Sequence, residues 1–561
     1  MTLAFYDGNT VKHSIVCSRS ENQRKGNIVS SISRRDFMGG ATLLAATGAL
    51  GFMAGCSPKT TSDAEEVKES LANTASPDET IDCDILVIGA GASGLAACVE
   101  GAEAGKKVIC IESQSQAGGN IVAVEGCFGI NSSMQKAEGI NIDTGDIVRQ
   151  ELTQGQYRVN GITYNTLIHR SGENIDWLLD HGVLFGGVDA DLGVDRVFHR
   201  FGTGNGAESY VPQMEAAAKS AGTQFLFDTH GESLLTDDNG AIVGAIATKK
   251  DGTILQINTP VVIIATGSYM NNEDYMLDLG LEAESMDYIG MPGHDGTGHD
   301  MAVAAGAKSN RGSSAPLGAL KVPNLPGKFD NGQFFYIGFK TPYAVWVNEN
   351  GERFVNEDCA EANFCLMQMP YANNQSTYII LDSAMMDTFI AGNAETTIDA
   401  AKAAQTEDSL SGDELTRNEL ADGIAKGSIF QSDSWSDLAA QVGMNPNTLE
   451  QTIARYNENV KAGSDGDFGK DPAALMSLEK APFYAIKTIN EILCVCGSVA
   501  TNTHSQAIDA RRQPIPGLYV VGIEGSMLWA NIYSINISGA CNANSVNSGR
   551  TAARHAIENY C

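Results

Sequence analysis

Residues 84–119 of the chain read DILVIGAGASGLAACVEGAEAGKKVICIESQSQAGG. An apolar run over residues 85–88 leads directly into the motif Gly89-x-Gly91-x-x-Gly94. An alanine-rich stretch of helical character follows, and a second β-type run closes the segment. The order strand, glycine turn, helix and strand is typical of the unit that holds a dinucleotide in α/β proteins. The stretch therefore predicts a dinucleotide site.

Each glycine of the motif has a separate physical reason. Gly89 permits the tight turn, Gly91 lets the main chain approach a pyrophosphate, and Gly94 allows close packing of helix on strand. The N-terminus of the helix then presents its N–H groups to the phosphates. Glu112, which ends the second β-type run, is placed to accept hydrogen bonds from the ribose hydroxyls of an adenosine. Because spacing, element order and the acidic residue agree, we favour this interpretation over a chance group of glycines.

Length and composition indicate a globular protein of more than one domain. A chain of 561 residues is too long for one hydrophobic core, so we expect two domains and a leader. Hydrophobic residues make up 43% of the chain and charged residues 19%. The formal net charge of −31, without any basic cluster, argues against a nucleic-acid partner.

Residues 33–56, SRRDFMGGATLLAATGALGFMAGC, have the polar basic head and the small apolar residues of an export signal. The pair Arg34-Arg35 resembles a twin-arginine signal, and the last four residues resemble the lipobox of bacterial lipoproteins. The resemblance implies cleavage before Cys56, lipidation of its thiol, and a lipid anchor that faces away from the cytoplasm. The alternative is an uncleaved membrane helix, but the apolar stretch 38–53 is short against a span of about 20 residues.

We therefore interpret residues 1–56 as a signal and residues 57–80, which lack apolar periodicity, as a flexible tether. Removal of the leader takes away six basic and three acidic side chains, which changes the net charge from −31 to −34.

The chain has 12 cysteines but no CxxC or CxxCH motif, so the sequence predicts no zinc ribbon, ferredoxin-like cluster or c-type haem. Cys494-x-Cys496 is the closest pair. For this pair, two small residues on one face of a strand are favoured over a metal or redox site, and no metal is expected.

Downstream motifs carry a resemblance to a known family. The apolar run 261–267, VVIIATG, resembles the returning strand of two-dinucleotide-type flavoproteins, whose ATG turn lies beside FAD. The motifs HDGTGHDMA, GERFVNE, ARYNENVKAGSDGDFGKDP, APFYAI and PIPGLYVVG follow in order. Together they are similar to the fumarate reductase/succinate dehydrogenase flavoprotein family, with its flavocytochrome c, urocanate reductase and 3-ketosteroid dehydrogenase-like branches. The match covers about residues 81–561.

The resemblance implies an α/β, Rossmann-like FAD-binding domain with an inserted α+β capping domain. Residues 81–290 and 487–561 would form the FAD-binding domain, and residues 291–486 the cap. FAD would be held without a covalent bond, because the family's link needs a histidine that residues 113–126 lack. The residues implied to contact FAD are Gly89, Gly91, Ala92, Ser93, Gly94, Glu112, Ser113, Gly118, Gly119, Asn120, Gly126, Ala265, Thr266, Gly267, Gly522, Glu524, Gly539, Ala540 and Cys541.

The active site departs from the family at each charged position that binds a dicarboxylate. Glu361 stands where the family has its proton-donating arginine, Cys494 and Cys496 where it has a histidine, and about Asn536 where it has a second arginine. A dianion without paired cations is costly to bury, so fumarate and succinate are not expected as substrates.

Aromatic residues stand near these positions: Trp529, Tyr533, Tyr336, Phe335 and Tyr343. Tyr533 resembles, two residues out of register, a tyrosine that polarises a carbonyl in the ketosteroid dehydrogenase branch. For the other four, packing of the cap is the favoured interpretation. The candidate catalytic residues are thus Tyr533, Glu361 and Arg353, the last from the RFVNE motif.

The sequence therefore predicts an exported FAD-dependent reductase. It would transfer a hydride from flavin N5 to an activated C=C of an enone or aryl-acrylate type substrate, with Glu361 or Tyr533 as acid. Because no second GxGxxG, haem or iron–sulfur motif is present, electrons would come from a cytochrome c or flavin carrier linked to quinol. Two alternatives stay open: a 3-ketosteroid-type dehydrogenase working in the oxidative direction, and a non-catalytic flavin electron relay.

Overall fold

The computed structural model divides the chain at Thr74, and its described part falls within the unit Ala75–Cys561. The leader with Cys56 and residues 57–75 of the tether lie outside the described residues. In the part that is described, no helix is both long and apolar enough to span a membrane. The described residues are 76–191, 195–327, 332–362, 365, 373–393, 411–529, 531–534 and 537–561.

A six-stranded sheet holds the predicted dinucleotide unit, in the order β18-β19-β11-β2-β3-β7. At its centre β2 (Ile85–Ile88) pairs in parallel with β3 (Val108–Ile111) and with β11 (Val262–Ile264). The other strands are β7 (Gln224–Leu226), β18 (Gln506–Ile508) and β19 (Pro514–Val520). Since β18 and β19 come from the C-terminal segment, the two distant parts of the chain share one sheet.

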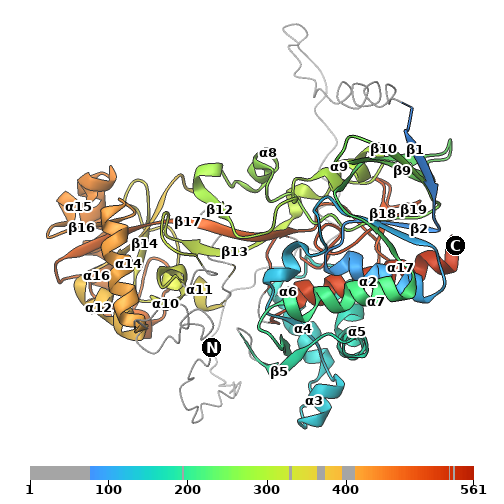
Figure 1. Cartoon of the computed structure of the whole chain (residues 1–561). Coiled ribbons are helices and arrows are strands. Elements are labelled where there is room, and N and C mark those ends of the chain that lie inside the picture. Colours follow the sequence, from blue (N-terminus) through green and yellow to red (C-terminus); the bar gives the residue numbers. More distant parts are fainter. Residues whose placement is uncertain are drawn as a thin grey trace, which may run out of the picture. The chain divides into compact units, whose positions relative to one another are not determined.

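Side chains of β2 alternate between two layers. Ile85 and Val87 join a core with the helices α2 (Ala92–Glu103), α7 (Val211–Ala221) and α17 (Ala540–Asn559), which run together beside the sheet in Figure 1. Leu86 and Ile88 join a second core on the other face. Because both faces are covered, the strand is apolar throughout, as expected for a buried parallel sheet.

The second face of the sheet is covered by a four-stranded sheet in the order β1-β10-β9-β8. Three of its strands arise from the predicted run of strands before residue 266, and β1 begins two residues inside the predicted tether. The strands are β1 (Glu79–Asp82), β8 (Thr229–Thr236), β9 (Ile242–Lys249) and β10 (Ile254–Asn258).

Between β3 and β7 the chain forms helices and a small three-stranded sheet, in the order β4-β6-β5. Its elements are β4 (Gly126–Phe128), α3 (Ser133–Ala137), α4 (Thr144–Gln154), α5 (Gly161–Asp180), β5 (Phe185–Asp189), β6 (Phe198–Phe201) and α6 (Gly206–Ser209).

The inserted segment has its own core of buried side chains, among them Trp346, Ile379, Leu449 and Ile486. Its sheet has the order β12-β17-β15-β14, and two further strands pair with β17. The elements are β12 (Met286–Tyr288), β13 (Ala315–Lys321), β14 (Val345–Asn348), β15 (Thr377–Leu381), α12 (Ser383–Gly392), α14 (Gly412–Ala425), β16 (Ile429–Ser432), α15 (Trp435–Val442), α16 (Pro446–Ala462) and β17 (Phe483–Cys496).

Strand β17 is the longest of the described strands, with 14 residues. Its first half pairs with β15 and β16, and its second half with β12 and β13. The boundary drawn from the sequence between residues 486 and 487 falls inside this continuous strand. Its last residues are Cys494 and Cys496, so β17 leads from the inserted segment to the candidate site.

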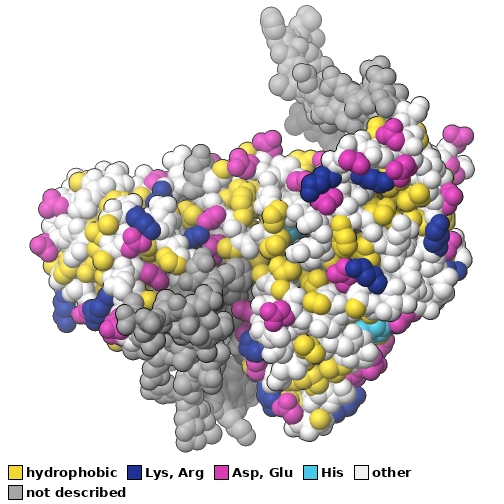
Figure 2. Space-filling model, in the orientation of Figure 1, with side chains coloured by type: hydrophobic (Ala, Val, Ile, Leu, Met, Phe, Trp, Pro, Cys, Tyr) yellow, Lys and Arg dark blue, Asp and Glu magenta, His cyan; other side chains and the backbone are white. Residues whose placement is uncertain are grey.

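Further short helices are α8 (Glu273–Met276), α9 (Thr297–Ala304), α10 (Ile337–Lys340) and α11 (Cys359–Ala362). On the face drawn in Figure 2, the described basic side chains are dispersed among acidic ones rather than gathered into a patch. The predicted α/β fold with an inserted α+β region is confirmed.

Candidate active site

The glycine turn after β2 is tight enough to require glycine. Gly89 has a φ of +104°, and a Cβ there would lie 2.5 Å from the carbonyl oxygen of Ala265. A Cβ on Gly94 would lie 1.9 Å from the carbonyl oxygen of Gly89. Gly91 is the N-cap of α2 and brings no side chain to cap the helix. The N–H groups of the first turn, which include Ala92 and Ser93, are thus presented for an anionic group.

A second glycine turn lies against the first. The Gly118 N–H donates to the carbonyl oxygen of Ala90 at 3.0 Å. A Cβ on Gly119 would lie only 3.6 Å from the Cα of Gly91. The two turns, almost 30 residues apart in sequence, therefore form one cradle lined by main chain. This observation fits the pyrophosphate of a dinucleotide.

The carboxylate of Glu112 holds the first turn in place. One oxygen accepts from the Ala90 N–H at 2.7 Å, and the other accepts from the Gln114 N–H at 2.8 Å. The Ser113 hydroxyl donates to the same carboxylate at 3.2 Å. Oε1 accepts two of these hydrogen bonds and Oε2 accepts one, so one lone pair of Oε2 is still available for the predicted hydrogen bond to a ribose.

The turn after β11 is joined to a buried carboxyl group. The Ala265 N–H donates to the Ile88 carbonyl oxygen at 2.7 Å. The Thr266 hydroxyl donates to one oxygen of Glu524, and the Ser498 hydroxyl donates to the other at 2.9 Å. Burial raises the pKa of Glu524 to about 7. Glu524 thus connects the ATG turn to the segments that follow β17 and β19.

Gly267 completes that turn with a φ of +89°. A Cβ at this position would lie 2.2 Å from Nδ1 of His294, which also accepts from the Ser268 N–H at 3.4 Å. Burial lowers the pKa of His294 to about 4, so its ring is neutral and acts as an acceptor. The first residue of the HDGTGHD motif is therefore a support for the ATG turn.

Gly522, after β19, lies between α2 and α17. A Cβ there would lie 2.6 Å from the hydroxyl oxygen of Ser93, and its N–H donates to the Ser548 hydroxyl at 2.9 Å. The structure therefore brings the early glycine motif, the strand near residue 520 and the last helix to one place.

Three further residues that were predicted to contact FAD lie where main-chain segments meet. The Asn120 side chain donates to the Leu493 carbonyl at 2.8 Å and accepts from the Met291 N–H at 2.8 Å. The Gly126 carbonyl accepts from the Asn542 side chain at 3.1 Å. Gly539, at φ +81°, is the N-cap of α17, ahead of Ala540 and Cys541. These contacts fix the N-terminus of α17 against β4.

Tyr533 lies at this helix end. Its ring stacks on Trp529 with the centroids 4.3 Å apart, and its side chain is almost wholly buried. The phenolic oxygen accepts a hydrogen bond from the Cys541 N–H at 3.2 Å. Burial raises the pKa of Tyr533 well above its usual value, so the phenol keeps its proton at neutral pH.

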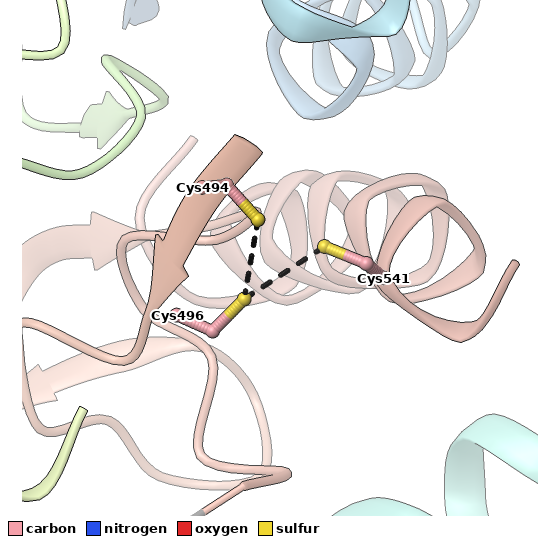
Figure 3. Close-up of side chains that lie close together, drawn as sticks. All are labelled: Cys494, Cys496 and Cys541. Carbon is pink, nitrogen blue, oxygen red and sulfur yellow. Dashed lines mark hydrogen bonds between the residues drawn. The ribbon is translucent and has the colours of Figure 1, made fainter. Parts of the chain in front are cut away.

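Cysteines meet beside Tyr533, which the sequence pattern did not indicate. The thiol of Cys496 lies 3.8 Å from that of Cys494 and 3.8 Å from that of Cys541 (Figure 3). Spacing alone could find the first pair but not Cys541, which comes from the helix 45 residues further on.

The sequence also gave no sign of a buried carboxylic acid, Glu151 on α4. The Ser534 hydroxyl donates to the carboxylate of Glu151, which is wholly buried, and the Tyr164 hydroxyl lies 3.4 Å from the same serine. This network secures the segment that carries Tyr533. The helix of Glu151 looks amphipathic and polar in sequence, and nothing in that pattern marks a buried carboxylate.

Arg353 lies in a different environment. Its guanidinium makes two hydrogen bonds to Glu357, at 2.9 and 2.7 Å, and an ion pair with Asp465 at 2.9 Å. Lys470 adds a contact to Glu357 at 3.3 Å. The guanidinium and both carboxylates are buried in the inserted segment. This arrangement indicates a structural role, and we remove Arg353 from the candidate catalytic residues.

Of the remaining candidate residues, two have side chains that the structure describes and three do not. Tyr343 donates to the Met385 carbonyl at 3.3 Å and Phe335 is buried, both as expected for packing. Glu361 lies in α11 and Tyr336 in a short 3-10 helix, but their side chains lie outside the description, as does Asn536 altogether.

A parallel sheet with two glycine turns in one cradle, an ATG turn and a converging helix N-terminus defines an FAD-binding flavoprotein. Residues 84–531 match the FAD binding domain family, and the chain belongs to that family. It is an FAD-dependent oxidoreductase of the fumarate reductase type, which acts on CH–CH groups. The predicted cofactor, FAD, is confirmed.

Relatives span nearly the whole chain. A vinyl phenol reductase of Lactiplantibacillus plantarum is 30% identical over 85% of this chain and 96% of its own length. A cytochrome-type fumarate reductase of Shewanella frigidimarina is 26% identical, over 88% of this chain and 80% of that protein. A digoxin reductase of Eggerthella lenta is 25% identical, over 94% of this chain and 97% of that protein.

Solved structures agree in fold. An open flavocytochrome c3 fumarate reductase has a TM-score of 0.60 at 22% identity, over 89% of this chain and 81% of that chain. A 3-ketosteroid-Δ4-(5α)-dehydrogenase from Rhodococcus jostii RHA1 has a TM-score of 0.61 at 20% identity, over 86% of this chain and 98% of that chain. At such identities the likeness shows the fold alone.

Proposed function

We propose that the protein is an exported FAD-dependent reductase that saturates an activated C=C bond of an uncharged or singly charged substrate. The substrate class is that of enones and aryl-conjugated alkenes. Bound FAD supplies the hydride for such a reduction. The protein supplies the site for the substrate, exclusion of water, and an acid for the second hydrogen.

Tyr533 carries this proposal. It is a protonated phenol in a buried aromatic stack, with its oxygen held by an amide at the N-terminus of α17. A donor in this position can stabilise negative charge that develops on a carbonyl or aryl oxygen of the substrate. The helix N-terminus favours the same charge. Trp529 stacks on this phenol and fixes its ring, a contact worth about 0.5–1.5 kcal/mol beyond burial.

The charge of the site supports the same substrate class. The positions of a family histidine and a family arginine read Cys494 and Glu361, and the guanidinium of Arg353 is already bound by two carboxylates. A substrate dianion would lose hydration without gaining paired cations, at a cost of several kcal/mol. Vinyl phenol, which names the relative at 30% identity, carries no carboxylate.

A panel assay tests the proposal. The chain from residue 57 onward is purified with FAD and supplied with a reduced viologen dye in the absence of oxygen. We expect dye oxidation with 4-vinylphenol, benzylideneacetone or a cyclic enone. Absence of turnover with every acceptor would favour an electron relay, and preferred oxidation of saturated ketones would favour the ketosteroid-type reaction.

Export and lipidation are part of the proposal and rest on the leader sequence. Electrons would then come from a cytochrome or flavin carrier linked to quinol, because no nicotinamide-binding motif is present in the chain. Arg34→Lys with Arg35→Lys should leave the protein in the cytoplasm, and Cys56→Ala should release it from the membrane fraction. Unchanged fractionation of both variants would contradict the proposed leader.

A further inference from the structure

The three cysteines beside Tyr533 form a compact thiol cluster. Cys494 and Cys496 lie at the end of β17, and Cys541 is the second residue of α17. In Figure 3 the three sulfur atoms point toward one another from these two elements. All three lie within 4.8 Å of one another, and in the described part of the chain this is the one group of three or more metal-ligating side chains.

The sulfur positions fit a metal ion better than a disulfide. Two thiolates bound to Zn²⁺ at about 2.3 Å in tetrahedral geometry lie about 3.8 Å apart. Both sulfur pairs that involve Cys496 have a separation of 3.8 Å. A disulfide requires a sulfur–sulfur distance of about 2.05 Å, which neither of these pairs has. We propose that Cys494, Cys496 and Cys541 bind one Zn²⁺ ion through three thiolates, with the fourth position open.

Zinc is bound by thiolates, so each of the three thiols must lose its proton when the ion binds. Binding of Zn²⁺ replaces the three thiol protons, which are released to solvent, and no electron is transferred.

The charge balance favours Zn²⁺ over Cu⁺, the other ion that prefers thiolates. Three thiolates leave a net charge of −1 with Zn²⁺ and −2 with Cu⁺. In a site with two wholly or almost wholly buried thiols, the smaller charge costs less to desolvate. The N-terminus of α17, equivalent to about half a positive charge, offsets part of it. Three protein ligands with an open position are typical of catalytic rather than structural zinc.

The site goes beyond the proposed function, because it rests on thiol geometry and not on the identity of the substrate. A metal at the cluster would lie next to the amide that holds Tyr533. No metal was expected from the sequence, in which Cys494 and Cys496 fit two small residues on one face of a strand. The tertiary structure supplies that ligand.

Metal binding to the FAD-loaded protein tests the inference without an activity measurement. The protein is reduced, freed of metal and titrated with Co²⁺, which gives intense thiolate-to-cobalt absorption bands. We expect one Co²⁺ per chain, displacement of these bands by Zn²⁺, and zinc in elemental analysis of protein purified anaerobically. Cys494→Ser, Cys496→Ser and Cys541→Ser should each weaken binding by at least about 10-fold.

The control is Cys98→Ser with Cys110→Ser, a pair of buried thiols in α2 and β3. This variant should bind Co²⁺ like the natural protein. FAD content and the melting temperature show whether each variant folds. If a cluster variant does not fold, the proposal is tested on the natural protein instead. Bound Zn²⁺ should protect its Cys494, Cys496 and Cys541 from alkylation.

Three results would overturn the proposal. The first is a reduced protein that binds neither Co²⁺ nor Zn²⁺ and whose thiols gain no protection. The second is binding that persists at full affinity in Cys541→Ser. The third is a cluster that, as purified, contains a disulfide or iron with sulfide in place of zinc.

Discussion

The phenolic oxygen of Tyr533 lies 3.2 Å from the main-chain nitrogen of Cys541 and accepts its hydrogen bond. The amide belongs to the first turn of α17, so the oxygen is fixed at the positive end of the helix. Trp529 holds the ring from one side. This single contact joins the aromatic site to the helix that the fold places against the FAD-binding segments.

Replacement of Tyr533 by phenylalanine tests the role of the hydroxyl. Tyr533→Phe removes the donor but keeps the ring and its stacking on Trp529. We expect kcat to fall by about 10²–10³-fold, as for loss of a donor to a developing oxyanion. Steady-state assays with a reduced viologen dye give kcat, and flavin absorbance gives the FAD content, which should not change.

Tyr519→Phe is the matched control. Tyr519 is also buried, and its hydroxyl is hydrogen-bonded to His555 at 2.7 Å in another part of the fold. This variant should keep its kcat. An unaltered kcat in Tyr533→Phe would contradict the proposed pocket.

The ion pairs of Arg353 predict a loss of stability when it is replaced. Arg353→Ala leaves the carboxylates of Glu357 and Asp465 buried without their main partner. Breaking such a pair costs about 3–5 kcal/mol. We expect a melting temperature lowered by about 5 °C or more, with near-normal kcat per folded, FAD-containing molecule.

Arg455→Ala is the control for this variant, because Arg455 is exposed and pairs with Asp467 at the surface. Its melting temperature should stay the same. If Arg353→Ala instead melts like the natural protein but loses turnover, Arg353 is catalytic and our structural assignment is wrong.

The buried carboxyl of Glu524 predicts a pH dependence of stability. Its pKa of about 7 in the folded protein lies above the ordinary value of 4.5. Between these values the folded state binds more protons than the unfolded state, so the free energy of unfolding falls as pH rises through this window. The shift corresponds to roughly 3 kcal/mol.

Glu524→Gln should remove this dependence. Denaturant unfolding of the FAD-loaded protein at pH 5 and pH 8 should show a smaller loss of stability in Glu524→Gln than in the natural protein. Glu282→Gln, at an exposed position, should retain the natural slope. Equal slopes in all three proteins would show that Glu524 is ionised across the range.

FAD should be released by denaturation. The segment 113–126 has no histidine to form the family's covalent bond. Precipitation with acid should therefore leave all of the yellow flavin in the supernatant. A fluorescent protein band after denaturing electrophoresis would contradict this prediction.

The sequence predicted the elements that depend on local pattern. The run from Ile85 to Glu112 specified a strand, a turn and a helix, because no side chain fits at Gly89 or Gly94 and the apolar strands must be covered on both faces. The ATG turn at residue 265 was found for the same reason. In such stretches, the type of each residue follows from its immediate structural surroundings.

The sequence did not predict side-chain contacts between residues that are distant in the chain. Arg353 looked like a candidate catalytic cation, but Asp465, more than 100 residues away, helps to bury and neutralise it. Cys541 joins Cys494 and Cys496 only because α17 packs against the end of β17. No periodicity in the chain carries information on such distant pairs.

One measurement tests the central claim, that the site lacks the paired cations for a dicarboxylate, most directly. It compares kcat/KM for dimethyl fumarate, monomethyl fumarate and fumarate, which share one C=C bond and carry zero, one and two negative charges. We predict that the diester and the monoester are reduced and that kcat/KM for fumarate is lower by at least about 100-fold, the equivalent of roughly 3 kcal/mol for an unpaired buried charge. A kcat/KM for fumarate equal to or above that of the diester would contradict the account.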